Sequence, residues 1–176
     1  MSDPETVFST PWFSIERESF PRLEAYKSEP FYRFRTGDGV VILALTNAQE
    51  VILVRQFRPS FNDYSLELPS GFIDEGESPR EAGARELLEE TGYVCESLQE
   101  VGTTRAMMNR VSGLELSVFG EGAVRAPSAV VESDIEVVLA PLNEFRDLIC
   151  SGEFHQSSSL AMITLLNVKF GRNLLA

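Results

Sequence analysis

Hydrophobic residues follow two kinds of pattern along the chain, and each pattern predicts a different element. The apolar runs VVILAL at 40–45 and VILVRQF at 51–57 flank the polar stretch TNAQE and indicate neighbouring buried strands. GDG at 37–39 predicts a tight turn between strands. Shorter apolar or alternating segments predict further strands at 31–35, 64–69, 98–104, 113–121 and 135–140.

The strongest helix signal covers residues 78–91. Ser78 suits the N-cap, Pro79 the first helical position, and Glu81 completes a capping box. Gly92 suits the left-handed residue that ends a helix. Two more helices are predicted, from about 141 to 149 and from about 157 through LAMITLLNV. The positions expected to form the packing face of the first helix recur at helical spacing: Ala84, Leu87, Leu88 and Thr91.

The order of these elements is strands, helix, strands and helices, which predicts an α/β protein with a mixed sheet between helices. Residues 1–35 contain aromatic residues and short alternating pieces, and we expect them to form a β-rich extension. Residues 36–176 would then form the main domain, and 176 residues in all are enough for one domain with its own core.

Composition and charge narrow the possible functions. The formal net charge of -12 and the lack of a basic cluster argue against nucleic acid or an anionic membrane as a partner. No apolar stretch reaches the length of a membrane span. Residues 1–12 lack a basic region followed by an apolar run, so we do not expect them to be a signal peptide. Cys95 and Cys150 form no CxxC motif, so we expect reduced core cysteines in a cytoplasmic protein.

Three acidic residues, Glu86, Glu89 and Glu90, share one side of the predicted helix within roughly 100° of one another. A solvated helix face would explain such residues in an arbitrary sequence. Here they lie in the C-terminal half of the helix, where the macrodipole disfavours negative charge. Bound divalent cations, which prefer oxygen ligands, would offset that cost. Arg85 is expected to pair with Glu77 and orient a metal-binding carboxylate.

The stretch GFIDEGESPREAGARELLEETGY at 71–93 resembles the Nudix box, G-x5-E-x7-R-E-U-x-E-E-x-G-U, where U is a bulky aliphatic residue. Tyr93 replaces the last aliphatic residue. The resemblance implies a Nudix α/β/α sandwich that uses Mg²⁺ or Mn²⁺ to hydrolyse a nucleoside diphosphate linked to another group. The other fixed positions of the box are matched by Gly71, Glu77, Arg85, Glu86, Leu87, Glu89, Glu90 and Gly92.

The same resemblance implies roles for individual residues. Glu86 and Glu90 would bind the metal directly, and the Ser70 carbonyl would be a further ligand. Glu89 would be a third ligand, a water-mediated ligand or the general base. The family places a glutamate on a mobile loop late in the chain as base or extra ligand. The segment VVESDIEVV offers Glu132 and Asp134 for this role, and we favour Glu132.

The segment VILVRQFRPSFNDYSLELPSG, which leads into the box, is similar to the ADP-ribose pyrophosphatase branch. In this reading Arg58 contacts a phosphate, while Glu67 either binds the nucleoside or pairs with an arginine. That branch stacks adenine on aromatic residues of the N-terminal extension in a swapped homodimer. Trp12 is our first candidate for this contact, ahead of Phe13 and Tyr32.

One departure from that branch leaves the substrate open. A proline usual about 15 residues after the box is absent, and Met107 lies in the corresponding region of TTRAMMNRVSG. Arg105 in this segment is a candidate contact for phosphate or the distal sugar. We therefore expect a nucleoside diphosphate sugar hydrolase, ADP-ribose first. GDP-mannose, NADH or a dinucleoside polyphosphate are alternative substrates, and a non-catalytic nucleotide-binding module is an alternative function. A capped-RNA hydrolase is disfavoured by the charge.

Overall fold

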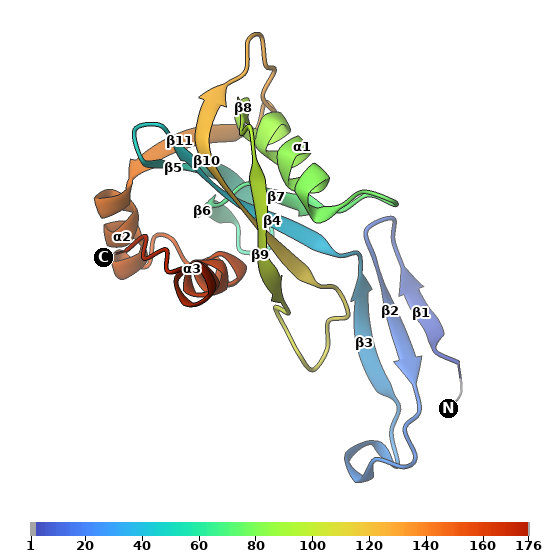
Figure 1. The fold of residues 1–176 in the computed structure, drawn as a ribbon. Helices are drawn as coiled ribbons and strands as arrows, with labels where there is room; N and C mark the ends of the chain where they lie inside the picture. Colours follow the sequence, from blue (N-terminus) through green and yellow to red (C-terminus); the bar gives the residue numbers. More distant parts are fainter. Residues whose placement is uncertain (1–2, 176) are drawn as a thin grey trace.

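The computed structural model describes residues 3–175, which form two β-sheets and the helices that cover the larger one. Figure 1 shows the small sheet standing beside the body of the molecule, joined to it where β3 leads into β4. The small sheet pairs its strands in the order β1-β2-β3. Its elements are β1 (Glu5–Ser9), β2 (Phe13–Glu18), the 3-10 helix η1 (Glu24–Tyr26) and β3 (Phe31–Thr36).

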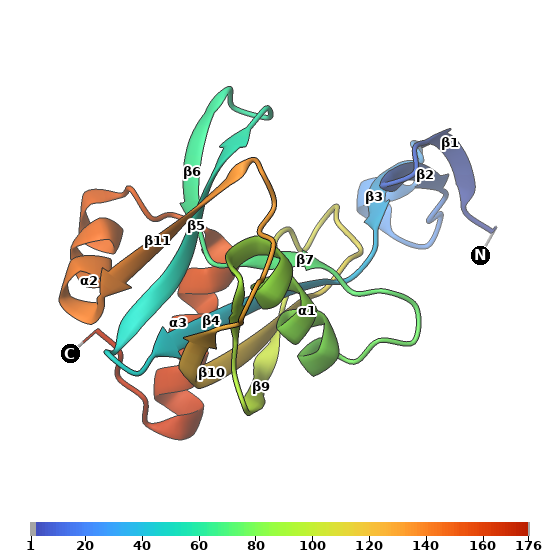
Figure 2. The same cartoon turned by 90° about the horizontal axis from the view of Figure 1, so that it is seen from above.

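The large sheet follows the path β11-β5-β4-β10-β8, with β6, β7 and β9 paired to its members. β10 runs parallel to β4, while β5 and β11 are antiparallel, so the sheet is mixed. Figure 2 shows β5 and β6 extending beyond the rest of the sheet. Its strands are β4 (Gly39–Thr46), β5 (Glu50–Arg58), β6 (Asp63–Glu67), β7 (Ser70–Phe72), β8 (Tyr93–Val94), β9 (Leu98–Thr104), β10 (Glu115–Arg125) and β11 (Ile135–Pro141).

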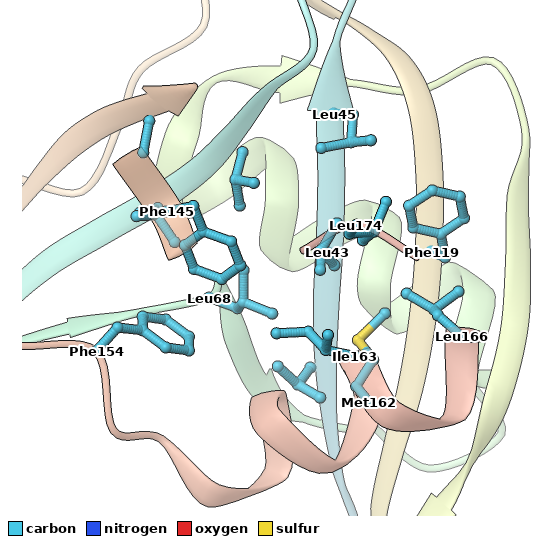
Figure 3. Packing of buried hydrophobic residues seen from close by; sticks show 14 of the residues in the cluster. Leu43, Leu45, Leu68, Phe119, Phe145, Phe154, Met162, Ile163, Leu166 and Leu174 are labelled. Atoms are coloured by element: carbon cyan, nitrogen blue, oxygen red, sulfur yellow. The ribbon is translucent and has the colours of Figure 1, made fainter. Parts of the chain in front are cut away.

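Helices cover both faces of the large sheet, which is the predicted α/β/α sandwich. The alternation along β4 explains the two layers. Val40 and Ile42 face α1, whereas Val41 and Leu43 face α2 and α3. Figure 3 shows Leu43 with Phe145 of α2 and Met162 of α3. Residues 40–45 of this strand are all apolar because both faces of the strand are buried. The helices are α1 (Pro79–Thr91), α2 (Leu142–Ser151) and α3 (Ser157–Phe170). Within residues 3–175 no helix is long and apolar enough to cross a membrane.

The start and end of α1 follow the sequence prediction. Ser78 and Glu81 form the reciprocal capping box, and Gly92 ends the helix at φ 74°. The predicted packing face was partly wrong, because Ala84 and Leu88 are exposed. The residues that α1 does bury are Ala82, Gly83, Glu86, Leu87, Glu90 and Thr91. The helix therefore turns two of its glutamates toward the sheet.

Two further predictions were wrong. Gly37 and Asp38 do not form a hairpin turn, because β3 pairs with β2 in the small sheet and β4 belongs to the large sheet. Asp38 instead connects the segments before β10 and after β7. Its side chain accepts a hydrogen bond from the Leu114 N–H, and its carbonyl accepts one from the Ile73 N–H. Cys150 is exposed on α2 rather than buried in the core, whereas Cys95 is partly buried.

Candidate active site

Arg85 is the centre of a charged network on α1. Its Nε and Nη2 donate to the two carboxylate oxygens of Glu77, each at 3.0 Å. Its Nη1 donates to Glu86 at 2.6 Å and to Glu89 at 3.2 Å, while Nη2 also donates to the Phe72 carbonyl at 2.8 Å. Arg85 thus holds the loop before α1 against the helix and fixes the Glu86 carboxylate, as the sequence predicted for the Glu77 pair.

Glu86 and Glu90 are buried although both are acidic, whereas Glu89 is exposed. Burial raises the pKa of Glu86, and it raises that of Glu90 to about 8 although the Ser70 N–H donates to Glu90 at 2.9 Å. The charge of Glu132 also raises the pKa of both residues. The structure therefore brings Glu86, Glu90 and Glu132 close enough to repel one another.

The glycine that begins the box is required by the position of Glu86. A Cβ on Gly71 would lie 2.0 Å from Oε1 of Glu86 and 2.3 Å from its Cδ. Any side chain at residue 71 would therefore displace the carboxylate. Because β7 pairs with β4, the Gly71 backbone cannot easily move away.

The loop between β10 and β11 is attached to the end of α1. The Glu132 N–H donates to the Glu89 carbonyl at 3.2 Å, and the Ala126 N–H donates to the Gly92 carbonyl at 2.8 Å. A Cβ on Gly92 would lie 3.3 Å from Val131 in the same loop. These contacts place Glu132 beside the box carboxylates, which lie about 40 residues earlier in the chain.

Arg58 is the last residue of β5 and Glu67 the last of β6, and their side chains form a bidentate ion pair. Nε and Nη2 of Arg58 donate to the two oxygens of Glu67 at 2.7 and 2.6 Å. This pair raises the pKa of Arg58, and the charge of Glu90 adds to the effect, so Arg58 also lies near the box acids. Of the two roles considered for Glu67, the structure shows the arginine pair.

A cleft of about 350 Å³, here called the Ser70 cleft, lies beside this network. It includes Arg58, Glu67 and Ser70, all of which the sequence had singled out. A larger hollow of about 760 Å³ between β6, β11 and α2 contains none of the box residues, so the smaller cleft is the better candidate site. The other residues that line the Ser70 cleft are Thr36, Gly37, Gly39, Val40, Gly71, Phe72, Ala106, Val111, Gly113, Leu114, Glu115, Gln156 and Ser158.

Two other predicted contacts lie outside this cleft. Trp12 is 71% exposed on the turn between β1 and β2. Arg105 is exposed, and its Nη1 donates to the Ser112 carbonyl at 2.7 Å. Conversely, sequence reasoning missed Glu115 and Gln156, because no motif includes them and only the fold brings them to the cleft.

The box supplies Glu77 in the loop before α1 and three glutamates on α1, and Arg85 donates hydrogen bonds to Glu77, Glu86 and Glu89. In residues 3–175 no three acidic, histidine or cysteine side chains are already arranged around one point as metal ligands. The donor set nonetheless fits a hard divalent cation, because Glu86 and Glu90 are buried oxygen donors whose charges repel.

A mixed sheet between helix layers, with buried carboxylates on one helix beside a polar cleft, defines an α/β/α sandwich with an acidic site. The model of the NUDIX domain matches residues 35–144, which is more than half of the chain. The chain belongs to the NUDIX domain family.

Relatives and a solved structure agree with this assignment. "ADP-sugar pyrophosphatase" of Mus musculus is 65% identical over 43 residues, which cover 24% of this chain and only 20% of that protein. "ADP-ribose pyrophosphatase" of Bacillus subtilis is 29% identical over 139 residues, which cover 74% of this chain and 72% of that protein. A structure described as "Crystal structure of ADP compounds hydrolase" matches with a TM-score of 0.80 at 23% identity. It covers 94% of this chain and 90% of that one, and it shows the fold. The predicted resemblance is thereby confirmed.

Proposed function

We propose that this protein hydrolyses the pyrophosphate bond of a nucleoside diphosphate sugar, with ADP-ribose as the first candidate. The products would be a nucleoside monophosphate and a sugar phosphate. One observation carries the proposal: α1 buries Glu86 and Glu90 beside Ser70 and Gly71, next to a polar cleft that contains Arg58. The names of the mouse and Bacillus subtilis relatives support the substrate class.

Mg²⁺, or Mn²⁺, is the cofactor that this donor set favours. Glu86, Glu90 and the Ser70 carbonyl would hold it, with Glu89 as a direct or water-mediated ligand. When bound, such a cation neutralises a diphosphate and lowers the pKa of a coordinated water. Arg85 orients Glu86 and Glu89 through hydrogen bonds from a single nitrogen, so it acts as a positioning residue.

Arg58 is suited to bind a phosphate. Glu67 fixes its guanidinium through Nε and Nη2, and among residues 3–175 no protein acceptor bonds to Nη1. A fixed guanidinium with a free N–H group is a charge-assisted donor for a phosphate oxygen. Glu132 is the proposed base that takes a proton from the attacking water, with Glu89 as the alternative.

A homodimer would explain the exposed side chains of the small sheet. Val7, Phe8, Trp12 and Tyr32 are between 45% and 71% exposed in a single copy. We propose that Trp12 of one subunit stacks on the adenine bound by the other and that residues 1–35 serve dimerisation and substrate binding. The proposed setting is the cytoplasm, with a small molecule and neither nucleic acid nor a membrane as partner. Light scattering of wild type and Trp12→Ala tests the dimer.

A substrate panel measured with and without Mg²⁺ tests the function. It should contain ADP-ribose, ADP-glucose, GDP-mannose, NADH and a dinucleoside polyphosphate. Wild type should cleave ADP-ribose fastest, and Glu90→Gln should lose about 10³-fold in kcat with the fold intact. Glu96→Gln, an exposed glutamate outside the site, is the matched control. Tight nucleotide binding with no turnover in Mg²⁺ or Mn²⁺ would instead identify a non-catalytic module.

A further inference from the structure

Glu115 is a carboxylate in the Ser70 cleft that the proposed hydrolysis does not use. It begins β10 and lies beside Gly39 of the parallel strand β4. It is partly buried, and this burial raises its pKa. In residues 3–175 no hydrogen bond or ion pair satisfies its side chain, whereas the other cleft glutamate, Glu67, is paired with Arg58. An unpaired carboxylate at a ligand cleft is free to accept hydrogen bonds from a ligand.

The backbone around Glu115 is held firmly. The Gly39 N–H donates to the Leu114 carbonyl at 2.8 Å, and the Leu114 N–H donates to Oδ1 of Asp38 at 2.8 Å. A Cβ on Gly113 would lie 2.5 Å from the Gly37 carbonyl, so the two segments are in close contact. Glu115 therefore enters the cleft from a fixed position.

The start of α3 supplies hydrogen-bond donors that complement the Glu115 carboxylate. Oε1 of Gln156 accepts hydrogen bonds from the Leu68 N–H, at 3.0 Å, and from the Ser159 hydroxyl. Since its oxygen is occupied, Gln156 has only its NH₂ group to offer to a ligand. Ser158 adds a hydroxyl. The cleft thus combines a carboxylate acceptor, an amide donor and a hydroxyl.

The polar groups of the Ser70 cleft fit sugar hydroxyls better than a nucleobase or a further phosphate group. Each hydroxyl both donates and accepts, so it can satisfy Glu115 and Gln156 together. A purine needs flat apolar surfaces, and Phe72 is the only aromatic residue among the described residues that line the cleft. A further anionic group would face the unpaired Glu115, and the one cation that lines the cleft among the described residues, Arg58, is already assigned to the diphosphate.

We propose that Glu115, with Gln156, binds the sugar beyond the diphosphate and selects an uncharged, polyhydroxylated group over an anionic one. This inference rests on the proposed function and names the part of the substrate that this end of the site recognises. A charged hydrogen bond of this kind contributes roughly tenfold to a hundredfold in kcat/KM.

The first test compares ADP-glucose with ADP-glucuronic acid, which differ by a carboxylate at C6 of the sugar. Wild type should prefer ADP-glucose at least tenfold. Glu115→Gln, which keeps the shape, should lower kcat/KM for ADP-glucose and raise it for ADP-glucuronic acid, so the preference should fall at least tenfold. The control variant Glu96→Gln should leave the preference for ADP-glucose unchanged. A preference that Glu115→Gln and Glu115→Ala both retain would overturn the inference.

The second test uses calorimetry of the two products and does not depend on turnover. Glu115→Gln should weaken binding of ribose 5-phosphate to the Mg²⁺-loaded protein about tenfold and leave AMP binding unchanged. Weaker AMP binding alone, or no change for either compound, would contradict the inference. If wild type cleaves no nucleotide sugar, the proposed function fails, while ribose 5-phosphate binding still decides the role of Glu115. Melting curves of both variants confirm that they are folded.

Discussion

Gly71 and Glu86 are in such close contact that one methyl group on the glycine would lie 2.0 Å from the carboxylate oxygen. The contact lies between the strand β7 and the helix α1, and it places the backbone next to Ser70 directly against the buried Glu86 carboxylate. A glycine at the start of the box therefore lets a carboxylate of α1 reach the backbone of β7.

Gly71→Ala should separate activity from stability. The atoms that must move belong to the end of the flexible Glu86 side chain, so the fold can adjust by turning the carboxylate aside. We expect turnover to fall at least tenfold with a change in Tm of no more than about 3 °C. Steady-state kinetics and a thermal melt measure the two effects.

Gly83→Ala is the matched control on α1. Its Cβ would lie at an ordinary 3.4 Å from Val118, and alanine is favoured over glycine inside a helix by about 1 kcal/mol. This variant should keep its activity and melt slightly higher than wild type. Equal loss of turnover in both variants would show that backbone changes in general, not the Glu86 contact, cause the effect.

The raised pKa of Glu90 predicts how the metal-free protein responds to pH. Burial, with the charges of Glu86 and Glu132, moves this pKa from its ordinary 4.5 to about 8. Between these values the unfolded chain has lost the proton and the folded chain still holds it, so stability falls as pH rises from about 4.5 to 8. Thermal melts in EDTA should show this decrease.

Glu90→Gln removes the group that titrates, so its melting temperature should vary less over the same pH range. Saturating Mg²⁺ should restore stability to wild type at pH 8, because a bound cation favours the ionised carboxylate. Glu90→Gln should gain much less from Mg²⁺. A wild-type melting temperature that rises toward pH 8 without metal would contradict the assignment.

The Arg58–Glu67 pair predicts a double-mutant cycle. Arg58→Ala leaves the buried Glu67 carboxylate without its partner and should cost about 2 kcal/mol of unfolding free energy. In the double variant Arg58→Ala/Glu67→Gln no charge remains unpaired, so part of the lost unfolding free energy should be regained. Urea denaturation measures each free energy. Activity should stay low in both variants that lack Arg58, and a double variant with normal kcat/KM would exclude a phosphate contact for this arginine.

Local signals in the sequence predicted the elements well but did not predict which way they face. The Ser78 cap and Gly92 define α1 through contacts within a few residues, so a pattern is enough to find them. The direction of the helix depends on its neighbours. Helical spacing placed Ala84 and Leu88 inside, but the helix buries Glu86 and Glu90 instead, beside the Ser70 and Gly71 backbone. Burying carboxylates is a cost that a hydrophobicity pattern does not anticipate.

Only part of the Ser70 cleft could be predicted from the sequence, namely Arg58, Glu67 and Ser70. No local pattern distinguishes Glu115, which begins a strand, or Gln156, which precedes a helix. They meet because β10 pairs in parallel with β4 and because α3 begins at the same end of the sheet. Pairing between strands 76 residues apart, as in Gly39 and Glu115, is not encoded in local spacing.

Glu132 gives the last prediction, which concerns the general base. Its loop is anchored to α1 at Glu89 and Gly92, and its charge reaches both Glu86 and Glu90. Glu132→Gln should lower kcat by roughly 10²–10⁴-fold and remove the acidic limb of the pH–rate profile. Asp134→Asn, in the same loop, should change neither.

Glu89→Gln decides between the two candidate bases. Glu89 lies on the exposed side of α1, and among the described side chains only that of Arg85 forms a hydrogen bond with its carboxylate. If Glu89 is a water-mediated ligand, this variant should lower kcat at all pH values and keep the acidic limb. Loss of that limb in Glu89→Gln, with the limb preserved in Glu132→Gln, would assign the base to Glu89. In that case the contact between the Glu132 N–H and the Glu89 carbonyl would serve to position α1 rather than to deliver a base.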